Sequence, residues 1–247
     1  MIKVFAFDID GTVMHSWRSH SSNDVCVEFI DNAEHGYMSG DMIERLLRLK
    51  KIYELVPVTS RSLAQYNRIM WPKEITPSVA FIDNGAYVRR IIDGNQYEIE
   101  DLRAGRGFVP GGNITAIVES LNENPNIRSA RIVDEAYILA ILADENADYK
   151  PSESLLGFSY MRDRKKAYFF PEYVTKANAI KYIRELYLSC YVVAAGDSAN
   201  DLTMADLADL FLAQPKELPT QDENGSYEMH VLHCLDRLIE QEARDGI

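Results

Sequence analysis

The first thirteen residues, MIKVFAFDIDGTV, constrain the fold of this chain more than any other stretch. Residues 4–7 form an apolar run without a polar face, which is typical of a strand buried on both sides of a parallel sheet. Asp8 and Asp10 follow directly, and Gly11 begins a turn in which the chain leaves the strand. Because ligands of open α/β sheets bind at the carboxyl ends of the strands, we expect the chemistry of the protein at this turn.

Two carboxylates this close repel each other unless a cation neutralises them or one of them keeps a proton. Either outcome would indicate a chemically active site. An Asp-Gly step after an apolar run is also an ordinary turn, so Asp8 and Asp10 alone do not distinguish a turn from a site. Polar groups at neighbouring strand ends are needed to support a site.

Length and composition place the chain among globular proteins. With 247 residues and 47% hydrophobic residues, it can form a large domain, or a domain with a smaller partner, around a substantial core. No apolar run reaches the length of a membrane span and no signal-peptide pattern precedes the first strand, so we expect a cytoplasmic protein. Cys26, Cys190 and Cys234 are widely spaced and odd in number, which argues against a disulfide framework or a zinc site.

The formal net charge of −12 disfavours nucleic acid and anionic membranes as partners, because binding to either needs clustered Lys and Arg. An anionic substrate would have to be held by local positive charge from a metal ion, a basic side chain or a helix N-terminus. We expect a small-molecule substrate and a monomer or homodimer.

Alternating helices and strands predict an α/β fold with a doubly wound parallel sheet, that is, a Rossmann-like core. Residues 15–32 are rich in Ser and His and predict an irregular segment, in which His15 and His20 are interpreted as solvated rather than metal-binding. The core is expected to contain helices at 39–51, 176–188, 202–208 and 231–244, and strands at 53–59, 79–82, 191–195 and 209–213.

The alternation is interrupted between residues 87 and 171. Asp93-Gly94-Asn95 separates two extended stretches and predicts a β-hairpin, and a helix and two further extended stretches follow it. Runs of strands inside an alternating chain suggest an α+β insert with its own small core. We therefore expect a core domain formed by 1–86 and 172–247, with a smaller α+β domain inserted at 87–171.

Polar side chains recur at the expected edge of the core, in the order Asp8 and Asp10, Thr59 to Arg61, Lys176, and Asp197 with Asn200 and Asp201. Each has a structural explanation by itself, since a lysine at a helix start is commonly solvated and an aspartate commonly caps a helix. Their recurrence at one edge favours a functional site, and it includes the local cations that an anionic substrate needs.

At these positions the chain resembles the haloacid dehalogenase superfamily of phosphatases. FDIDGT matches the first motif of that family, VTSR the second, Lys176 the third and GDSANDLTM the fourth. The resemblance covers the core, about two-thirds of the chain. The insert is similar, in position and general character only, to the cap of the Cof-type and sucrose-phosphate-phosphatase-like branch. Ser60 departs from the glycine that this branch usually has there, which leaves the local geometry open.

The resemblance implies that Asp8 attacks phosphorus and forms an aspartyl-phosphate, since a carboxylate is already ionised and needs no base. It implies that Asp10 first protonates the leaving oxygen and later activates the water that hydrolyses the intermediate. These roles require a proton on Asp10 beside an ionised Asp8, a separation of pKa values that a close pair of carboxyls favours.

The resemblance also implies a Mg²⁺ ion, a hard cation that prefers carboxylate, water and phosphate oxygens. Its implied ligands are the side chain of Asp8, the backbone carbonyl of Asp10 and the side chain of Asp197. Asp201 is implied either as a further ligand or as a partner that holds one in place.

The remaining motif residues are implied to bind the substrate. Thr59 and Lys176 would hold the phosphoryl oxygens, with Ser60 and Arg61 in the same phosphate-binding segment, and Asn200 would orient the substrate or the neighbouring aspartate. Such contacts place positive charge and donors where the transition state of phosphoryl transfer spreads negative charge.

The resulting hypothesis is a Mg²⁺-dependent phosphatase acting on a small phosphomonoester, with a sugar phosphate preferred from the resemblance alone. A phosphomutase or phosphotransferase on the same core remains an alternative, as does a non-catalytic phosphate-sensing interaction protein. The intact catalytic acids argue against the non-catalytic alternative. A dehalogenase is disfavoured because it has no need of Asp10 or of an acidic metal cluster.

Overall fold

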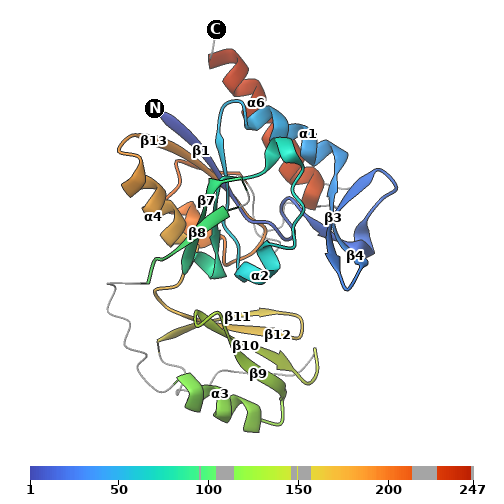
Figure 1. The fold of residues 1–247 in the computed structure, drawn as a ribbon, viewed down its shortest axis with the longest axis vertical. Coiled ribbons are helices and arrows are strands. Elements are labelled where there is room, and N and C mark those ends of the chain that lie inside the picture. The colour runs from blue at the N-terminus through green and yellow to red at the C-terminus, as the bar shows by residue number, and fades with distance from the viewer. Residues whose placement is uncertain (95, 104–113, 146–148, 150–156, 213–226, 246–247) are drawn as a thin grey trace. The chain divides into compact units, whose positions relative to one another are not determined.

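The computed structural model describes residues 1–94, 96–103, 114–145, 149, 157–212 and 227–245. The chain forms two compact units, one made of residues 1–100 with 176–247 and the other of residues 101–175. Figure 1 labels their helices and strands, and each unit is described by itself. No helix in the described part of the chain is long and apolar enough to cross a membrane.

The first unit is built on a parallel sheet of β1 (Ile2–Phe7), β5 (Glu54–Pro57), β13 (Cys190–Ala195) and β14 (Leu210–Phe211). Their order is β14-β13-β1-β5. β1 thus lies between β5, which precedes the second unit in the sequence, and β13, which follows it. A parallel bridge between Val58 and Phe81 sets β6 (Val79–Ile82) beside β5. The predicted parallel-sheet core is confirmed.

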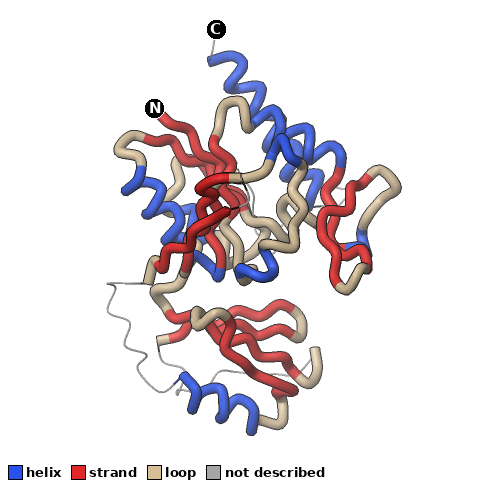
Figure 2. The backbone as a smooth tube through the Cα atoms, viewed as in Figure 1, coloured by secondary structure: helices blue, strands red, loops and turns tan. Residues whose placement is uncertain are grey.

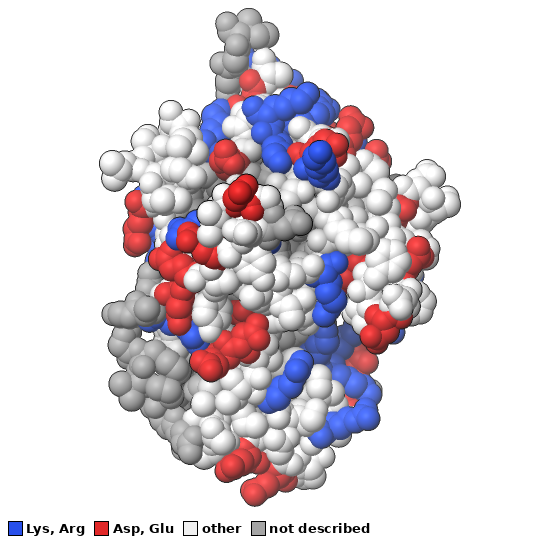
Figure 3. Space-filling view, in the orientation of Figure 1, with Lys and Arg blue, Asp and Glu red and all other residues white. Residues whose placement is uncertain are grey.

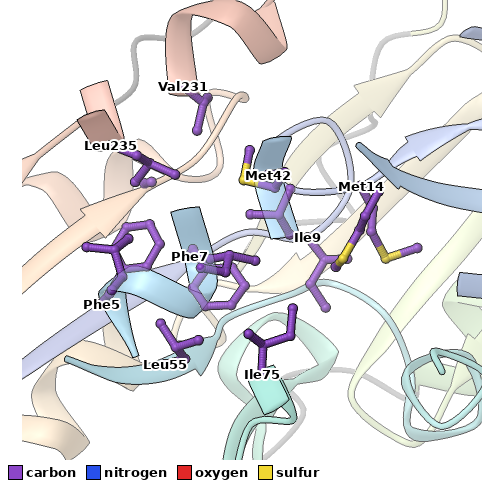
Figure 4. Packing of buried hydrophobic residues seen from close by; sticks show 14 of the residues in the cluster. Phe5, Phe7, Ile9, Met14, Met42, Leu55, Ile75, Val231 and Leu235 are labelled. Carbon is purple, nitrogen blue, oxygen red and sulfur yellow. The ribbon is translucent and has the colours of Figure 1, made fainter. Parts of the chain in front are cut away.

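One face of this sheet is covered by α1 (Gly40–Leu49) and α6 (Tyr227–Asp245). Phe5 and Phe7 point from β1 into a cluster of buried side chains, which Leu235 enters from α6 (Figure 4). Both phenylalanines are fully buried, which stabilises the sheet by removing large apolar surfaces from water. The cluster therefore fixes the strand that carries the two N-terminal acids.

The opposite face is covered by α4 (Ala177–Leu186), which is followed after β13 by the short α5 (Leu202–Ala205). The ring of Tyr182 in α4 meets the ring of Phe81 edge-on, with 5.7 Å between the centroids. Phe81 is absent from the Phe5 cluster, whereas its neighbours Ala80 and Ile82 belong to it, as the alternation of side chains along a strand requires. Helices on both faces make the sheet doubly wound.

A small antiparallel sheet replaces the irregular segment expected at 15–32, and consists of β2 (His15–Ser16), β3 (Asp24–Ile30) and β4 (Ala33–Ser39). Asp31 and Asn32 connect β3 to β4 with φ angles of 51° and 65°. Positive φ at both positions is what a type I′ hairpin turn requires, and Asn and Asp tolerate it. The expectation of irregular structure was wrong because the Ser- and His-rich start obscured this short turn signal.

Short helical turns complete the first unit at η1 (Trp17–Ser19), α2 (Leu63–Tyr66), η2 (Lys73–Ile75) and η3 (Asp83–Gly85). Two further strands, β7 (Tyr87–Asp93) and β8 (Gln96–Asp101), follow β6 in a sheet of order β6-β7-β8. Because β7 pairs with β6, residues 87–100 belong to the first unit. The boundary expected at 87 thus differs from the start of the second unit at Asp101, and the end expected at 171 differs from its last residue, Thr175.

The second unit is an antiparallel sheet with one helix, α3 (Ile114–Glu123), and the strands β9 (Ile127–Val133), β10 (Tyr137–Leu142), β11 (Phe158–Asp163) and β12 (Lys166–Pro171). The strand order is β11-β12-β10-β9, and Figure 2 shows the strands of this unit in red and its helix in blue. Leu121 of α3 packs with Ile138 and Phe169 of the sheet in a separate cluster of buried side chains. The unit therefore has its own small core, in agreement with the α+β insert expected from the sequence.

Candidate active site

Three acids meet where β1 and β13 end. The backbone N–H of Asp8 donates to the carbonyl of Ala195 at 2.9 Å, which sets the end of β1 beside the end of β13. Carboxylate oxygens of Asp8, Asp197 and Asp201 all lie within 4.8 Å of one another. The structure thus brings together acids that lie almost two hundred residues apart in the sequence.

Lys176 lies just before α4 and is buried, with an exposed fraction of 2%. Its ammonium donates hydrogen bonds to Asp8 Oδ1 at 2.6 Å and to Asp201 Oδ1 at 2.5 Å. Burial would lower the pKa of Lys176, but the charges and hydrogen bonds of the two carboxylates raise it above its ordinary value. Lys176 is therefore a buried cation at the site, of the kind that an acidic protein needs to hold an anion.

Asp201 is held on both of its carboxylate oxygens. Its Oδ2 accepts hydrogen bonds from the backbone N–H of Ser198 at 2.9 Å and from the Ser198 hydroxyl at 2.6 Å. A Cβ at Gly196 would lie 2.2 Å from the Cβ of Asp201, so only glycine allows the loop to close this tightly. With both oxygens engaged by the protein, Asp201 is suited to holding Lys176 and the loop in place.

The acidic cluster carries unbalanced negative charge. Burial raises the pKa of Asp8 well above its ordinary value; Lys176 lowers it, and the carboxylates of Asp201, Asp197 and Asp10 raise it further. If the three clustered carboxylates are ionised, the one ammonium leaves two negative charges. A divalent cation with oxygen ligands would balance these charges and lower the pKa of Asp8. The donor set therefore fits a metal ion.

Gly11 allows the first turn to approach Asp197. Its φ angle is 80°, a left-handed conformation that other residues adopt only at a cost. A Cβ on Gly11 would lie 2.3 Å from Asp197 Oδ2 and 2.8 Å from Asp197 Cγ. Glycine is thus required here both by the backbone conformation and by the nearby carboxylate.

Thr59 follows β5 and is fully buried. Its backbone N–H donates to the carbonyl of Phe81 at 2.9 Å, and its hydroxyl accepts a hydrogen bond from the N–H of Arg61 at 3.2 Å. Ser60, the position that departs from the family pattern, is half-buried between them. The phosphate-binding segment expected from the sequence thus forms a tight turn at the same sheet edge as Asp8, since β5 pairs directly with β1.

Asn200 bonds to the loop after β6. Its side-chain amide donates to Asn84 Oδ1 at 2.6 Å, and the N–H of Asn84 donates to the carbonyl of Thr59 at 2.9 Å. Asp83, Asn84 and Gly85 have consecutive positive φ angles of 50°, 61° and 83°. This turn thus links the end of β6 to the segments that follow β5 and β13. The described side-chain partner of Asn200 is Asn84, and its role toward the substrate or Asp201 stays a prediction.

Asp10 and Arg61 form a separate pair. The Asp10 side chain is 59% exposed and accepts hydrogen bonds from Arg61 Nε at 2.6 Å and Nη2 at 2.8 Å. Arg61 also donates two hydrogen bonds to Glu28. A bidentate guanidinium stabilises ionised Asp10, while burial raises the pKa of Asp8. The protonated Asp10 and ionised Asp8 that the resemblance implies stay a prediction for the site with a bound divalent cation, which would lower the pKa of Asp8.

Two residues connected to the site, Glu28 and Asn84, were not predicted from the sequence. Glu28 belongs to the segment expected to be irregular, and its only sequence signal is an acid between the apolar residues Val27 and Phe29. Asn84 had a stronger signal, because it lies in a turn directly after a buried strand of the core, where site residues are expected.

The sequence matches no family model and no curated protein. Solved structures, in contrast, resemble the whole fold. A trehalose-6-phosphate phosphatase related protein aligns with a TM-score of 0.55 and 19% identity over 98% of this chain and 99% of its own. The sucrose-phosphatase of Synechocystis, solved with sucrose and phosphate, aligns with a TM-score of 0.54 and 11% identity over 87% of this chain and 84% of its own.

An IMP-nucleotidase of Plasmodium falciparum aligns with a TM-score of 0.58 and 11% identity, over 97% of this chain and 68% of its own. At these identities the likeness shows the fold. The chain therefore shares the fold of these solved structures, and the resemblance drawn from the four motifs is confirmed at the level of the fold.

Proposed function

We propose that the protein is a Mg²⁺-dependent phosphatase that hydrolyses a small phosphomonoester, a sugar phosphate, through an aspartyl-phosphate intermediate. The observation that carries this proposal is the buried Lys176, which joins Asp8 to Asp201 beside Asp197 at the carboxyl edge of the sheet. The arrangement combines a carboxylate nucleophile, a cation for the phosphate and an acidic cluster for a metal. The shared phosphatase fold supports the same reading.

In the first step, an oxygen of Asp8 attacks phosphorus and forms an acyl phosphate. The bond between phosphorus and the ester oxygen breaks, and its electron pair stays with that oxygen. Asp10 gives its proton to the leaving oxygen, so an alcohol departs and Asp10 becomes a carboxylate. The guanidinium of Arg61 favours this product state because it pairs with ionised Asp10.

In the second step, water attacks the phosphorus of the intermediate while Asp10 takes its proton. The bond between phosphorus and Asp8 breaks, which releases inorganic phosphate and restores both aspartates to their starting states. Asp10 thus acts as acid and then as base, and its carboxyl must reach both the leaving oxygen and the attacking water.

The phosphoryl oxygens would be held by Lys176 and by the turn at Thr59 and Ser60. Lys176 is already fixed by two carboxylates, so it needs no rearrangement to present its charge. Asn200 would support this turn indirectly through Asn84. Arg61 is assigned to Asp10 in this scheme, because its described hydrogen bonds leave it facing that carboxylate.

A Mg²⁺ ion would be held by the side chains of Asp8 and Asp197 and by the backbone carbonyl of Asp10, with Asp201 supporting them through Lys176 and Ser198. When bound, it supplies positive charge that lets an ionised aspartate approach an anionic phosphate. Mg²⁺ is proposed over softer metals because the clustered donors are carboxylate oxygens.

The substrate class is proposed from the named neighbours, two of which are a sugar-phosphate phosphatase and a protein related to one. A nucleotide is the second class to test, since a third neighbour is an IMP-nucleotidase. Residues 101–175 are proposed to act as the cap that selects the leaving group. The proposal includes a cytoplasmic location and no nucleic-acid partner, and the formal net charge of −12 supports the second point. Figure 3 shows acidic side chains beside the basic ones on one face of the molecule.

The test is release of inorganic phosphate from a panel of sugar phosphates and nucleoside monophosphates, with Mg²⁺ or with a chelator. We expect turnover that requires Mg²⁺ and disappears in Asp8→Asn, with a phospho-enzyme detectable by mass spectrometry only when Asp8 is present. Asp93→Asn, an exposed acid at the end of β7, is the matched control. Undiminished turnover in Asp8→Asn would refute the nucleophile, and formation of an isomer without free phosphate would show a mutase instead.

A further inference from the structure

A buried acid outside the motifs connects to the site. Glu28 on β3 is fully buried and accepts hydrogen bonds from Arg61 at 2.9 Å on each carboxylate oxygen. Arg68 donates to it at 3.0 Å, and a ring nitrogen of His35 lies 3.3 Å away. Burial would raise the pKa of Glu28, but the hydrogen bonds and charge of Arg61, helped by Arg68 and His35, lower it. Glu28 is therefore an ionised and fully paired carboxylate.

The hairpin is shaped to place Glu28 there. The register between β3 and β4 shifts on both sides of Glu28, a bulge of the kind that redirects a side chain. A Cβ on Gly36, which lies opposite in β4, would come within 3.1 Å of Glu28 Oε2, so glycine leaves room for the carboxylate. The strand is also tied to the rest of the unit, since Met70 donates its N–H to the carbonyl of Val27 at 2.7 Å.

Arg61 connects this buried carboxylate to Asp10. Only 10% of its side chain is exposed, and its guanidinium bonds to Glu28 with two nitrogens and to Asp10 with two. A planar guanidinium held by one carboxylate has a fixed direction for its remaining donors. The place of the exposed Asp10 carboxyl is thus set by an ion pair whose other end lies in the hairpin.

We propose that Glu28 is a positioning residue for Asp10, acting through Arg61, and that the β3–β4 hairpin thereby governs proton transfer to the leaving oxygen. The inference rests on the proposed function, in which Asp10 gives that proton as the ester bond breaks. Without Glu28, Arg61 loses its buried partner, so its guanidinium no longer holds the Asp10 carboxyl in one orientation. The rate of ester cleavage then falls only for substrates whose leaving oxygen needs a proton.

This dependence gives a test that separates positioning from damage to the fold. An alkyl phosphate expels an alkoxide and needs the proton, whereas p-nitrophenyl phosphate expels a stable phenolate and does not. The quantity to compare is kcat/KM, because it reports the steps up to cleavage of the ester. For Glu28→Gln we expect a loss on the order of 10²-fold with the preferred sugar phosphate, and less than about threefold with p-nitrophenyl phosphate.

Glu34→Gln is the matched control, since Glu34 lies on the same hairpin, is exposed and bonds to Tyr37 rather than to Arg61. This variant should leave kcat/KM unchanged both with the preferred sugar phosphate and with p-nitrophenyl phosphate. The double variant with Arg61→Gln should show no further fall in the ratio of the two kcat/KM values, because both changes break the same connection. If Glu28→Gln does not fold, Glu28→Asp applies the same test, since it keeps the charge and shortens the reach to Arg61.

Equal losses with both substrates, no loss with either, or additive effects in the double variant would each overturn the positioning role while leaving the proposed phosphatase intact. The proposed function is judged separately, by Mg²⁺-dependent turnover of the wild-type protein and its absence in Asp8→Asn. If the wild-type protein hydrolyses neither substrate, both proposals are wrong.

Discussion

Lys176 and Asp8 lie 168 residues apart in the sequence and are joined by a buried hydrogen bond of 2.6 Å. The same ammonium also holds Asp201, so one cation balances part of the charge of two acids. The elements that carry these residues, the end of β1 and the start of α4, lie on either side of the second unit in the sequence. The pair therefore links the assembly of the first unit to the chemistry proposed for it.

Replacing Lys176 with methionine removes the cation and leaves two buried carboxylates facing each other. We expect Lys176→Met to lower the free energy of unfolding by about 3–5 kcal/mol, as loss of one partner of a buried ion pair does, and to abolish measurable turnover. The decrease in the free energy of unfolding should be larger with a chelator than with Mg²⁺, because a bound cation would replace part of the missing positive charge. Urea unfolding with and without Mg²⁺ measures this.

Lys181→Met controls for that experiment, since Lys181 lies on the same helix and is exposed. Its stability and turnover should match the wild-type protein. A Lys176→Met protein with wild-type stability in the chelator would contradict the assigned charge balance.

Gly11→Ala should disturb the metal-binding cluster itself. The added Cβ would meet Asp197 Oδ2 at 2.3 Å, so either the turn or the carboxylate must move. We expect turnover to fall on the order of 10²-fold, since small displacements of reacting groups have effects of this size, and the Mg²⁺ concentration for half-maximal activity to rise. Phosphate release across a Mg²⁺ titration measures both.

The matched control is Gly157→Ala, where φ is 88° but a Cβ would meet nothing within 4 Å. Both variants bear the cost of a left-handed alanine, about 1–2 kcal/mol of stability, whereas only Gly11→Ala carries the clash. Similar turnover in the two variants would show that Asp197 does not depend on this contact.

The docking of α6 provides a pH-dependent prediction away from the site. Burial would raise the pKa of Glu242, but hydrogen bonds from Lys3 and from the Tyr53 hydroxyl lower it below its ordinary value of 4.5. A lowered pKa in the folded state stabilises the protein above pH 4.5, and this stabilisation is lost as the pH falls through the folded-state value. Glu242→Gln should thus cost about 1–2 kcal/mol at pH 7 and progressively less in acid.

Urea unfolding at a series of pH values measures this difference. Glu240→Gln, an exposed neighbour on the same helix, should have little effect at any pH. A difference in the free energy of unfolding between Glu242→Gln and the wild-type protein that stays constant from neutral to acid pH would argue against an ionic role for this residue.

Much of the core and of the acidic cluster could be predicted from the sequence because both follow from local patterns. Buried parallel strands are continuous apolar runs, and polar residues directly after them must share one edge of the sheet. That reasoning was enough to group Asp8, Asp197 and Asp201, which the structure brings together. Lys176 precedes a helix instead of following a strand, and its match to the third motif is what supported its place in the group.

The Arg61 network could not be predicted in the same way. Pairing of Glu28 with Arg61 depends on a bulge and on the space left by Gly36, and neither leaves a periodic signal in the sequence. The resemblance placed Arg61 in the phosphate-binding segment, and that role stays a prediction. The described partners of Arg61 include two acids, one of which comes from a hairpin that the composition of residues 15–32 concealed.

The central position of β1 also has a consequence for synthesis on the ribosome. Its partner β13, the cation Lys176 and the acids Asp197 and Asp201 are all translated after the entire second unit. Until then the nascent chain carries Asp8 without the positive charge of Lys176. One edge of β1 is also unpaired, and such an edge can pair with strands of other chains and cause aggregation. Folding of this unit is thus a late event in translation, and chaperone contact is expected to concentrate in that interval.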